Sequence, residues 1–122
     1  MADAQASFPF FVSSDPRALS AQERAIVERL LREQPPRYSE QAGALKVVGR
    51  CGCGACPTVF FQPHKDGDCE ADLVTMAGKD DSTGLVAVVL LEKEGILSQL
   101  EFYSVDGHDP WDVPNVETLE PW

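Results

Sequence analysis

The segment from Leu85 to Val105 places the strongest constraint on how this chain can fold. Leu85–Leu91 is an unbroken run of seven apolar residues, followed by the charged turn Glu92–Gly95 and a second, alternating run. The first run is rich in valine, which favours strands, and it is far shorter than the ~20 apolar residues of a membrane-spanning helix. Gly95 supplies the positive φ that a two-residue hairpin loop needs. The segment therefore predicts two antiparallel strands in the core of a sheet.

The hairpin loop also predicts which side chains share a face of the sheet. If Glu94-Gly95 is the loop, Lys93 pairs with Ile96, and successive side chains point to opposite faces. One face is mostly apolar and is expected to meet a helix: Leu91/Ser98, Val89/Leu100, Ala87/Phe102 and Leu85/Ser104. The other face mixes aliphatic and polar pairs: Glu92/Leu97, Leu90/Gln99, Val88/Glu101 and Val86/Tyr103. This mixed face is either covered by another segment or available to a partner.

A helix is expected before the sheet, beginning at Ser20. Ser20 and Glu23 have the Ser-x-x-Glu spacing of a capping box, in which each side chain accepts a hydrogen bond from the other residue's backbone amide. Pro35-Pro36 ends this helix at about Gln34. Its apolar residues share one face, which fits the apolar face of the hairpin: Ile26, Val27, Leu30 and Leu31.

Shorter apolar segments at residues 45–51, 58–62 and 71–77 predict the remaining strands. Their connections are too short for the crossovers that a parallel sheet requires. The predicted fold class is therefore α+β, with an N-terminal helix packed on a curled antiparallel sheet of about five strands in meander order.

The length of the chain, 122 residues, is expected for one domain. Residues 1–18 are expected to form an extended, weakly ordered N-terminal arm that Phe8, Phe10 and Phe11 attach to the body. The domain then spans residues 19–122 and ends in a tail that its prolines make irregular. Trp111 and Val113 are expected to pack this tail along the body, over the second face of the sheet, unless the tail is disordered.

The formal net charge of −10 argues against nucleic acids and anionic membranes as partners, because both bind clustered lysine and arginine. It is compatible with a basic or amphipathic protein partner, and also with solubility alone. The N-terminus has no basic segment and no uninterrupted apolar stretch typical of a signal peptide. A cytoplasmic location with reduced thiols is therefore expected.

The four cysteines, Cys51, Cys53, Cys56 and Cys69, allow three interpretations. They could form a tetrahedral zinc site, although three of them crowd one turn and Pro57 lacks an amide donor that zinc turns often use. Cys53-Gly-Ala-Cys56 has the Cys-x-x-Cys spacing of redox motifs, but a strand follows it instead of a helix. The favoured interpretation is a glycine-rich bend with partly buried thiols and no cofactor.

The histidines, His64 and His108, give no clear evidence for catalysis. Neither is part of a motif for an activated nucleophile, a phosphate-binding loop or a metalloprotease. The sequence therefore favours a non-enzymatic role. A small-molecule binder or enzyme with a pocket between helix and sheet remains the alternative, and a perturbed histidine in such a pocket would support it.

Two segments together resemble small bacterial proteins of unknown function. They are the Cys-Gly-Cys-Gly-x-Cys-Pro bend, Cys51–Pro57, and the Gly-x-Leu-x-x-Leu-Glu-x-Tyr hairpin that starts at Gly95, within residues 45–107. The resemblance implies a bacterial cytosolic protein. It implies no activity, and it carries no functional residues to this chain.

The leading interpretation is a small module that binds a protein partner through the mixed face of the hairpin. Exposed apolar patches usually mark interaction sites, and a carboxylate rim suits a basic or amphipathic partner. Whether the chain is a monomer or a homodimer is left open. The predicted partner-binding residues are Val86, Val88, Leu90, Leu97, Gln99, Glu101 and Tyr103.

Overall fold

A computed structural model describes residues 10–65 and 67–122 and contains one antiparallel sheet. The sheet has seven strands in the order β1-β2-β3-β6-β5-β4-β7. The helices are α2 (Ala21–Leu31), α3 (Pro36–Ala42) and the short 3₁₀ helix η1 (Val116–Thr118). The strands are β1 (Phe11–Ala18), β2 (Lys46–Cys51), β3 (Val59–Phe60), β4 (Ala71–Lys79), β5 (Leu85–Lys93), β6 (Ile96–Ser104) and β7 (Glu120–Pro121).

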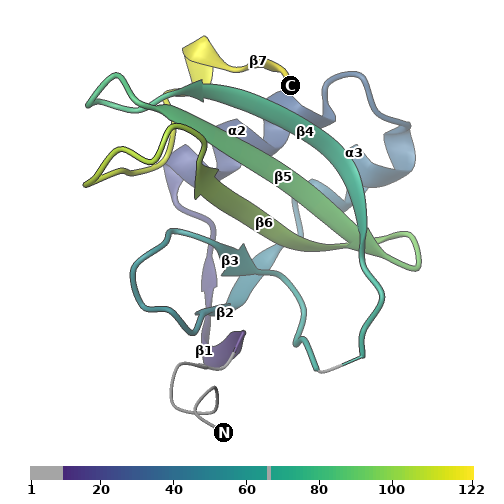
Figure 1. The fold of residues 1–122 in the computed structure, drawn as a ribbon. Helices are drawn as coiled ribbons and strands as arrows, with labels where there is room; N and C mark the ends of the chain where they lie inside the picture. The colour runs from purple at the N-terminus through teal and green to yellow at the C-terminus, as the bar shows by residue number, and fades with distance from the viewer. Residues whose placement is uncertain (1–9, 66) are drawn as a thin grey trace, which may run out of the picture.

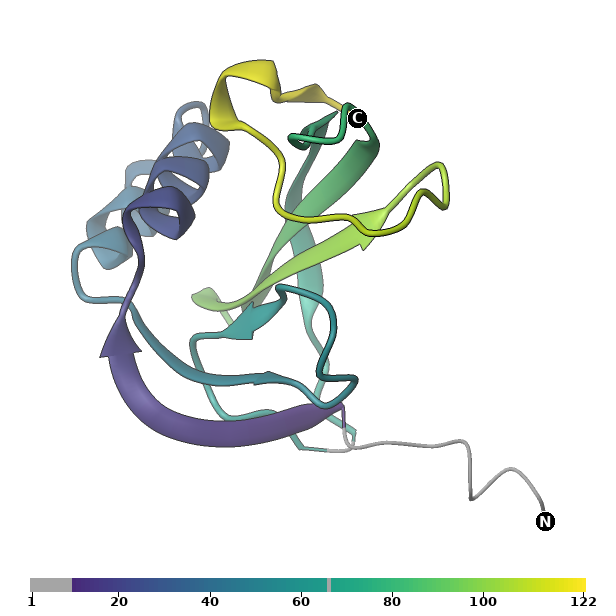
Figure 2. The same ribbon diagram turned by 90° about the vertical axis from the view of Figure 1, so that its left-hand side faces the viewer.

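Both α-helices lie on one side of the sheet, behind β4, β5 and β6 in Figure 1. Figure 2 shows that the sheet curls around the core and that the helices lie on its concave side. The core combines the apolar stripe of α2 with side chains of β4, β5 and β6, and Ile26, Val88 and Leu90 are completely buried there. The predicted α+β class and the antiparallel sheet are therefore confirmed. No helix of the described residues is long and apolar enough to cross a membrane.

The start of α2 is the one that the sequence predicts. The Ser20 hydroxyl accepts a hydrogen bond from the Glu23 amide at 3.0 Å, and the Glu23 carboxylate accepts one from the Ser20 amide at 2.8 Å. The end differs, because α2 stops at Leu31 and a second helix, α3, begins at Pro36. Proline fits the first helical position, where no amide donor is needed, so the Pro35-Pro36 pair both separates the helices and starts the second one.

The β5–β6 hairpin turns where predicted, but its expected register is wrong beyond the first pairs. Glu94 and Gly95 both have positive φ, Lys93 pairs with Ile96, and Glu92 pairs with Leu97. Leu91 then pairs with Gln99, because Ser98 is an extra residue in β6 that forms a β-bulge. Every later pair is shifted by one residue, which moves each side chain of β5 to the opposite face from the one expected.

This shift decides which residues meet the helices. Val86, Val88 and Leu90 point into the core, together with Leu100 and Phe102. The face of β4, β5 and β6 that points away from the helices is called the outer face below. It is formed by Asp72, Thr75, Ala77, Ala87, Val89, Leu91, Gln99, Glu101 and Tyr103.

The strand count and the meander order also differ from expectation. Phe11–Ala18, expected within an N-terminal arm, is an edge strand that pairs with β2. Strand β3 pairs with β6 and not with its successor β4, so residues 61–70 connect two strands that are not neighbours. Phe10 and Phe11 do attach this segment to the body through edge-on contacts with Phe60. Phe8 lies outside the described residues.

The C-terminal tail is more regular than its prolines suggest. It contains η1 and ends in β7, which pairs with β4 at Met76 and Ala77. Trp111 and Val113 pack against the core cluster on the concave side of the sheet. They do not cover the outer face, where the sequence analysis placed them.

The contact between β1 and β2 predicts the effect of one substitution. A Cβ atom added at Gly49 would overlap the ring of Phe11, whereas a Cβ at Gly43 would have nothing within 4 Å. We expect Gly49→Ala to lower the free energy of unfolding by about 1–3 kcal/mol through overpacking, and Gly43→Ala to change it little. Chemical denaturation of both variants tests this, and equal stabilities would contradict the packing of Phe11 on Gly49.

Candidate metal centre

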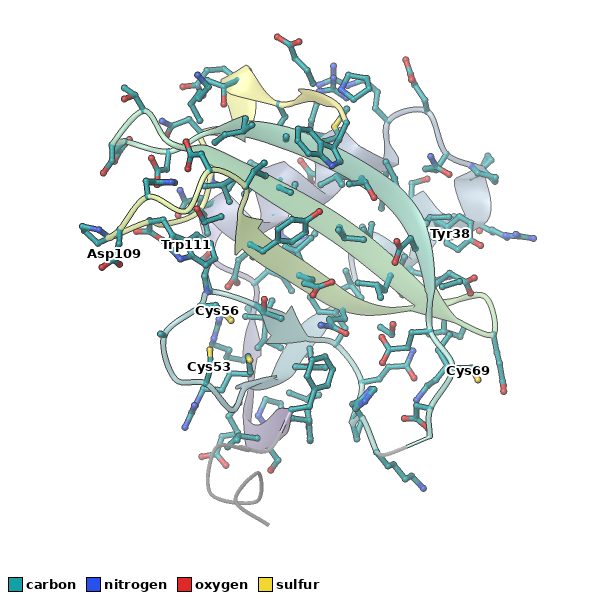
Figure 3. The ribbon with its side chains drawn as sticks, in the orientation of Figure 1. Tyr38, Cys53, Cys56, Cys69, Asp109 and Trp111 are labelled. Carbon is teal, nitrogen blue, oxygen red and sulfur yellow. The ribbon has the colours of Figure 1, made fainter. Side chains whose placement is uncertain are left out.

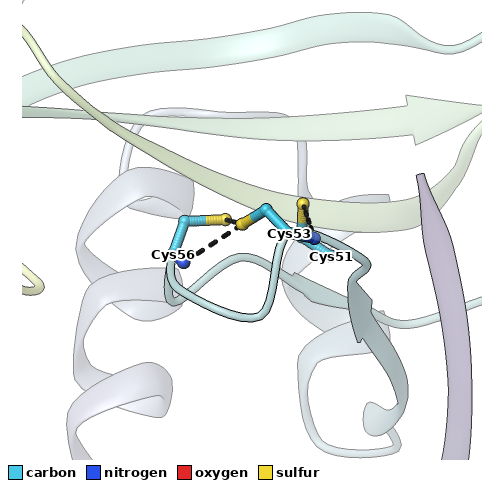
Figure 4. A group of neighbouring side chains, drawn as sticks. All are labelled: Cys51, Cys53 and Cys56. Carbon is cyan, nitrogen blue, oxygen red and sulfur yellow. Dashed lines mark hydrogen bonds between the residues drawn. The ribbon is translucent and has the colours of Figure 1, made fainter. Parts of the chain in front are cut away.

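The loop between β2 and β3 brings three cysteine side chains together (Figure 4). Cys51 ends β2, and the following turn reverses the chain at Gly54, whose φ of 74° suits glycine. The Gly54 amide donates a hydrogen bond to the Cys51 carbonyl at 3.3 Å, which holds the turn closed. Tight reversal of the chain thus directs the thiols of Cys51, Cys53 and Cys56 toward one another.

The three sulfur atoms are close enough to share one ion. All lie within 4.8 Å of one another, and those of Cys53 and Cys56 are 3.3 Å apart. Cys53 is exposed, whereas Cys51 and Cys56 are partly buried. Three thiols that converge at the surface in this way can bind a soft metal ion or react with one another.

Backbone amides of the turn point at the sulfur atoms. The amides of Ala55 and Cys56 donate to Cys53 Sγ at 3.4 and 3.3 Å, and the Cys53 amide donates to Cys51 Sγ at 3.5 Å. The bonds from Ala55 and Cys56 lower the pKa of the Cys53 thiol to about 7, because they stabilise the thiolate. Burial raises the pKa of Cys51 to about 11. These donors precede Pro57, so its missing amide removes nothing that the turn uses.

Cys69, the fourth cysteine, is exposed and does not belong to this group. Figure 3 shows it at the right, beside the segment that leads into β4, whereas Cys53 and Cys56 lie at the left. It lies in the connection between β3 and β4, which runs away from the cysteine loop. Of the four cysteines considered as candidate zinc ligands, the structure therefore groups three.

The predicted partner-binding residues do not form one surface. The β-bulge at Ser98 places four of them in the core with exposed fractions of 1% or less: Val86, Val88, Leu90 and Leu97. Gln99, Glu101 and Tyr103 point to the outer face instead. Gln99 is almost completely covered, so only Glu101 and Tyr103 remain available there, with Tyr103 41% exposed.

His64 belongs to a small network beside the outer face. Its Nδ1 atom pairs with Glu70, whose other oxygen accepts a hydrogen bond from the Ser98 hydroxyl at 2.7 Å. The carboxylate lies between the serine and the imidazole, so His64 cannot accept the proton of Ser98 as a catalytic base would. The ring of His64 instead packs against Phe10 and Phe60.

His108 connects the C-terminal tail to the β4–β5 turn. Its Nε2 atom lies 2.8 Å from a carboxylate oxygen of Asp80, and its Nδ1 atom bonds to Asp106. Both ring nitrogens are thus engaged, which leaves none to act on a substrate. The pKa of His108 is raised, first by the hydrogen bond to Asp80 and then by Asp106.

Asp80 is buried and fully paired. Besides His108 it accepts hydrogen bonds from three backbone amides at 2.9–3.0 Å: those of Ser82, Gly84 and Asp112. These bonds hold its pKa at about 2, with the largest effect from His108. Sequence analysis did not connect Asp80 with His108, because they are 28 residues apart and no local pattern indicates their contact.

Comparison with known proteins identifies a family for this chain but assigns no activity to it. A family model described as a domain of unknown function, DUF6984, matches residues 16–114. No curated protein and no solved structure matches the chain. The matched residues include both α-helices, the cysteine loop and the β5–β6 hairpin. This agrees with the resemblance to an uncharacterised family.

The difference in pKa between Cys53 and Cys51 predicts their order of alkylation. In reduced, chelator-treated protein near pH 7, Cys53 has far more thiolate than Cys51, although a thiol of higher pKa is intrinsically more nucleophilic. We expect iodoacetamide to label Cys53 about a hundredfold faster than Cys51. Peptide mass spectrometry with exposed Cys69 as internal reference measures this, and equal rates would contradict the role of the amide donors.

The cluster of His108, Asp80 and Asp106 predicts how stability depends on pH. The pKa of both carboxyls is about 2 against an ordinary 3.8, so their contribution is present above pH 3.8 and lost as the pH falls toward 2. The pKa of His108 is raised above 6.5, so its contribution is fully present below pH 6.5 and lost as the pH rises through the folded value. We expect His108→Gln to destabilise the protein more at about pH 5.5 than at about pH 9.

Urea denaturation at both pH values measures this difference. Asp80→Asn is the matched variant, because it keeps the shape of the side chain and removes the charge that raises the pKa of His108. In that background His108→Gln should lose most of its dependence on pH. A His108→Gln effect that does not vary with pH would contradict the charged cluster.

Proposed function

The chain belongs to the DUF6984 family, and we propose that it binds one zinc ion through the thiolates of Cys51, Cys53 and Cys56. The observation that carries this proposal is the grouping of the three sulfur atoms within 4.8 Å of one another. Free cysteines that bind nothing are usually buried as small apolar side chains, whereas these three meet at a turn where Cys53 is exposed.

The spacing of the sulfur atoms supports a tetrahedral ion. Zinc–sulfur bonds are about 2.3 Å long, so sulfur atoms on one tetrahedral zinc lie about 3.8 Å apart. The distance between Cys53 and Cys56, 3.3 Å, is slightly shorter than this, and the limit of 4.8 Å for the whole group is slightly longer. Small side-chain rotations would bring all three to bonding distance.

The surroundings of the sulfur atoms suit thiolates. The amides of Cys53, Ala55 and Cys56 already donate to sulfur, and such bonds orient metal ligands and reduce the charge on them. Thiolates are soft ligands, which favours zinc over calcium or magnesium. Displacing the protons of three thiols also makes binding stronger as the pH rises.

The fourth coordination position belongs to a group outside the loop. The group of metal-ligating side chains among the described residues contains three members, and Cys69 is not one of them. Water or a group from a binding partner therefore completes the tetrahedron. The thiols must stay reduced for this role, which is consistent with a cytoplasmic protein.

Zinc binding is tested with serine variants of each cysteine. Native mass spectrometry should show one zinc per chain for the unmodified protein and for Cys69→Ser, the matched control. Each of Cys51→Ser, Cys53→Ser and Cys56→Ser should weaken zinc binding by at least about tenfold. Cobalt(II) substitution should give a thiolate charge-transfer absorption that is retained in Cys69→Ser and reduced in the other three.

Two outcomes would contradict the three-ligand site. One is an unchanged metal-free mass in the presence of excess zinc under reducing conditions. The other is equal loss of zinc in Cys69→Ser, which would mean that Cys69 is a ligand after all. A mass two hydrogens below that of the reduced chain would instead indicate a disulfide between loop cysteines and an unmetallated protein.

A further inference from the structure

Among the described residues, no helix or strand packs on the outer face of β4, β5 and β6. In Figure 1 these strands face the viewer directly, and both α-helices lie behind them. The C-terminal tail packs on the concave side through Trp111 and Val113, so it does not cross the centre of this face. Ala87, Val89 and Gln99 are nevertheless buried on this side, so the accessible part of the outer face lies at residues such as Glu101 and Tyr103.

The exposed apolar surface on this side of the sheet is mainly aromatic, because Ala77, Ala87 and Val89 of the outer face are buried. Tyr103 is 41% exposed, and it stands beside the small, buried side chain of Ala87, its partner in β5. Trp122 is 60% exposed, and with Ala77 and Leu85 it lines a hollow at the β4 edge of the face. Exposed aromatic residues of this kind are enriched where proteins bind other proteins.

The charge of the outer face is negative. The pKa of the Glu101 carboxyl is raised, first by burial and then by the charges of Asp72 and Glu70. No ion pair among the described residues neutralises Glu101 or Asp72. Of the lysines near this region, Lys93 is paired with Asp68, and Lys79 lies at the far end of β4.

We propose that the outer face binds an extended, arginine-rich segment of a partner protein, with Tyr103 and Glu101 at the centre of the contact. One guanidinium group can stack on the exposed ring of Tyr103, and others along the segment can pair with the carboxylates of Glu101 and Asp72. Such a partner removes the repulsion between these carboxylates. The net charge of −10 also accelerates its approach.

An arginine peptide fits this face better than a lysine peptide does. Arginine offers a planar group that both stacks on an aromatic ring and binds a carboxylate with two hydrogen bonds, whereas lysine is a point charge. An extended segment can also lie along the antiparallel strands β5 and β6, because its alternate side chains can then contact the sheet. The proposal concerns a different surface from the cysteine loop and does not depend on zinc.

The test uses the full chain and three fluorescein-labelled octapeptides. They alternate glycine with arginine, lysine or glutamate, and fluorescence anisotropy measures their binding. We expect the arginine peptide to bind more tightly than the lysine peptide and the glutamate peptide not to bind. Tyr103→Ala and Glu101→Gln should each lower the affinity for the arginine peptide by about fivefold.

Glu28→Gln is the matched control, because it removes the same charge from an exposed position of α2, on the other side of the sheet. Its affinity for the arginine peptide should equal that of the unmodified chain. Amide chemical shifts on peptide addition should change at β5 and β6 and not at α2. Unchanged circular dichroism shows that each variant is folded.

Three results would overturn the proposal. If Glu28→Gln lowered the affinity for the arginine peptide as much as Glu101→Gln does, the binding would be a general attraction to an acidic protein. Amide chemical-shift changes spread over the whole surface would mean the same. A dimer in analytical ultracentrifugation that dissociates in Tyr103→Ala would assign the outer face to a second copy of this chain. Failure of zinc binding would leave these measurements unaffected, so the two proposals can fail separately.

Discussion

Burial of β5 on both faces, in the register that Ser98 imposes, is the constraint on which the rest of the structure depends. Val88 and Leu90 are completely buried beneath the helices, while Ala87 is completely buried on the opposite side. A strand of this kind tolerates no slip, because a shift of one residue exchanges its two faces. Ser98 is the extra residue in β6 that has no partner in β5. Because of it, both Leu97 and Leu100 face the core although they are three residues apart.

Hydrogen bonds between side chains and other segments attach the β4–β5 turn, the C-terminal tail and the β3–β4 connection to the rest of the fold. Asp80 joins the β4–β5 turn to the tail through His108 and the Asp112 amide. Gly84 allows this contact, because a Cβ there would overlap the imidazole ring. At the other end, Glu70 joins the β3–β4 connection to β6 through Ser98. The bulge residue thus sets the register and also anchors a loop that the sequence left unassigned.

The sequence predicts those parts of the fold that local chemistry determines. The capping box at Ser20 and the positive φ at Gly95 follow from neighbouring residues, and both are found. The bulge at Ser98, the strand at Phe11–Ala18 and the pairing of β3 with β6 depend on residues far apart in the chain. Alternation alone cannot reveal a bulge, because the inserted residue fits either face. The faces of β5 were therefore predicted inverted, whereas Leu100 and Phe102 of β6 face the helices as predicted.

The same limit applies to the cysteines, where local sequence indicated which residues to consider but not which converge. Cys69 is near enough in the sequence to be considered as a fourth ligand. The connection from β3 to β4 that carries it, however, runs away from the cysteine loop. Pro57 seemed to remove a necessary donor, but the turn takes its donors from Cys53, Ala55 and Cys56. Three thiolates in a chain of net charge −10 are costly unless a cation joins them. The proposed zinc ion would reduce the charge of that group to about −1, which would allow an acidic protein to hold three thiolates at one turn.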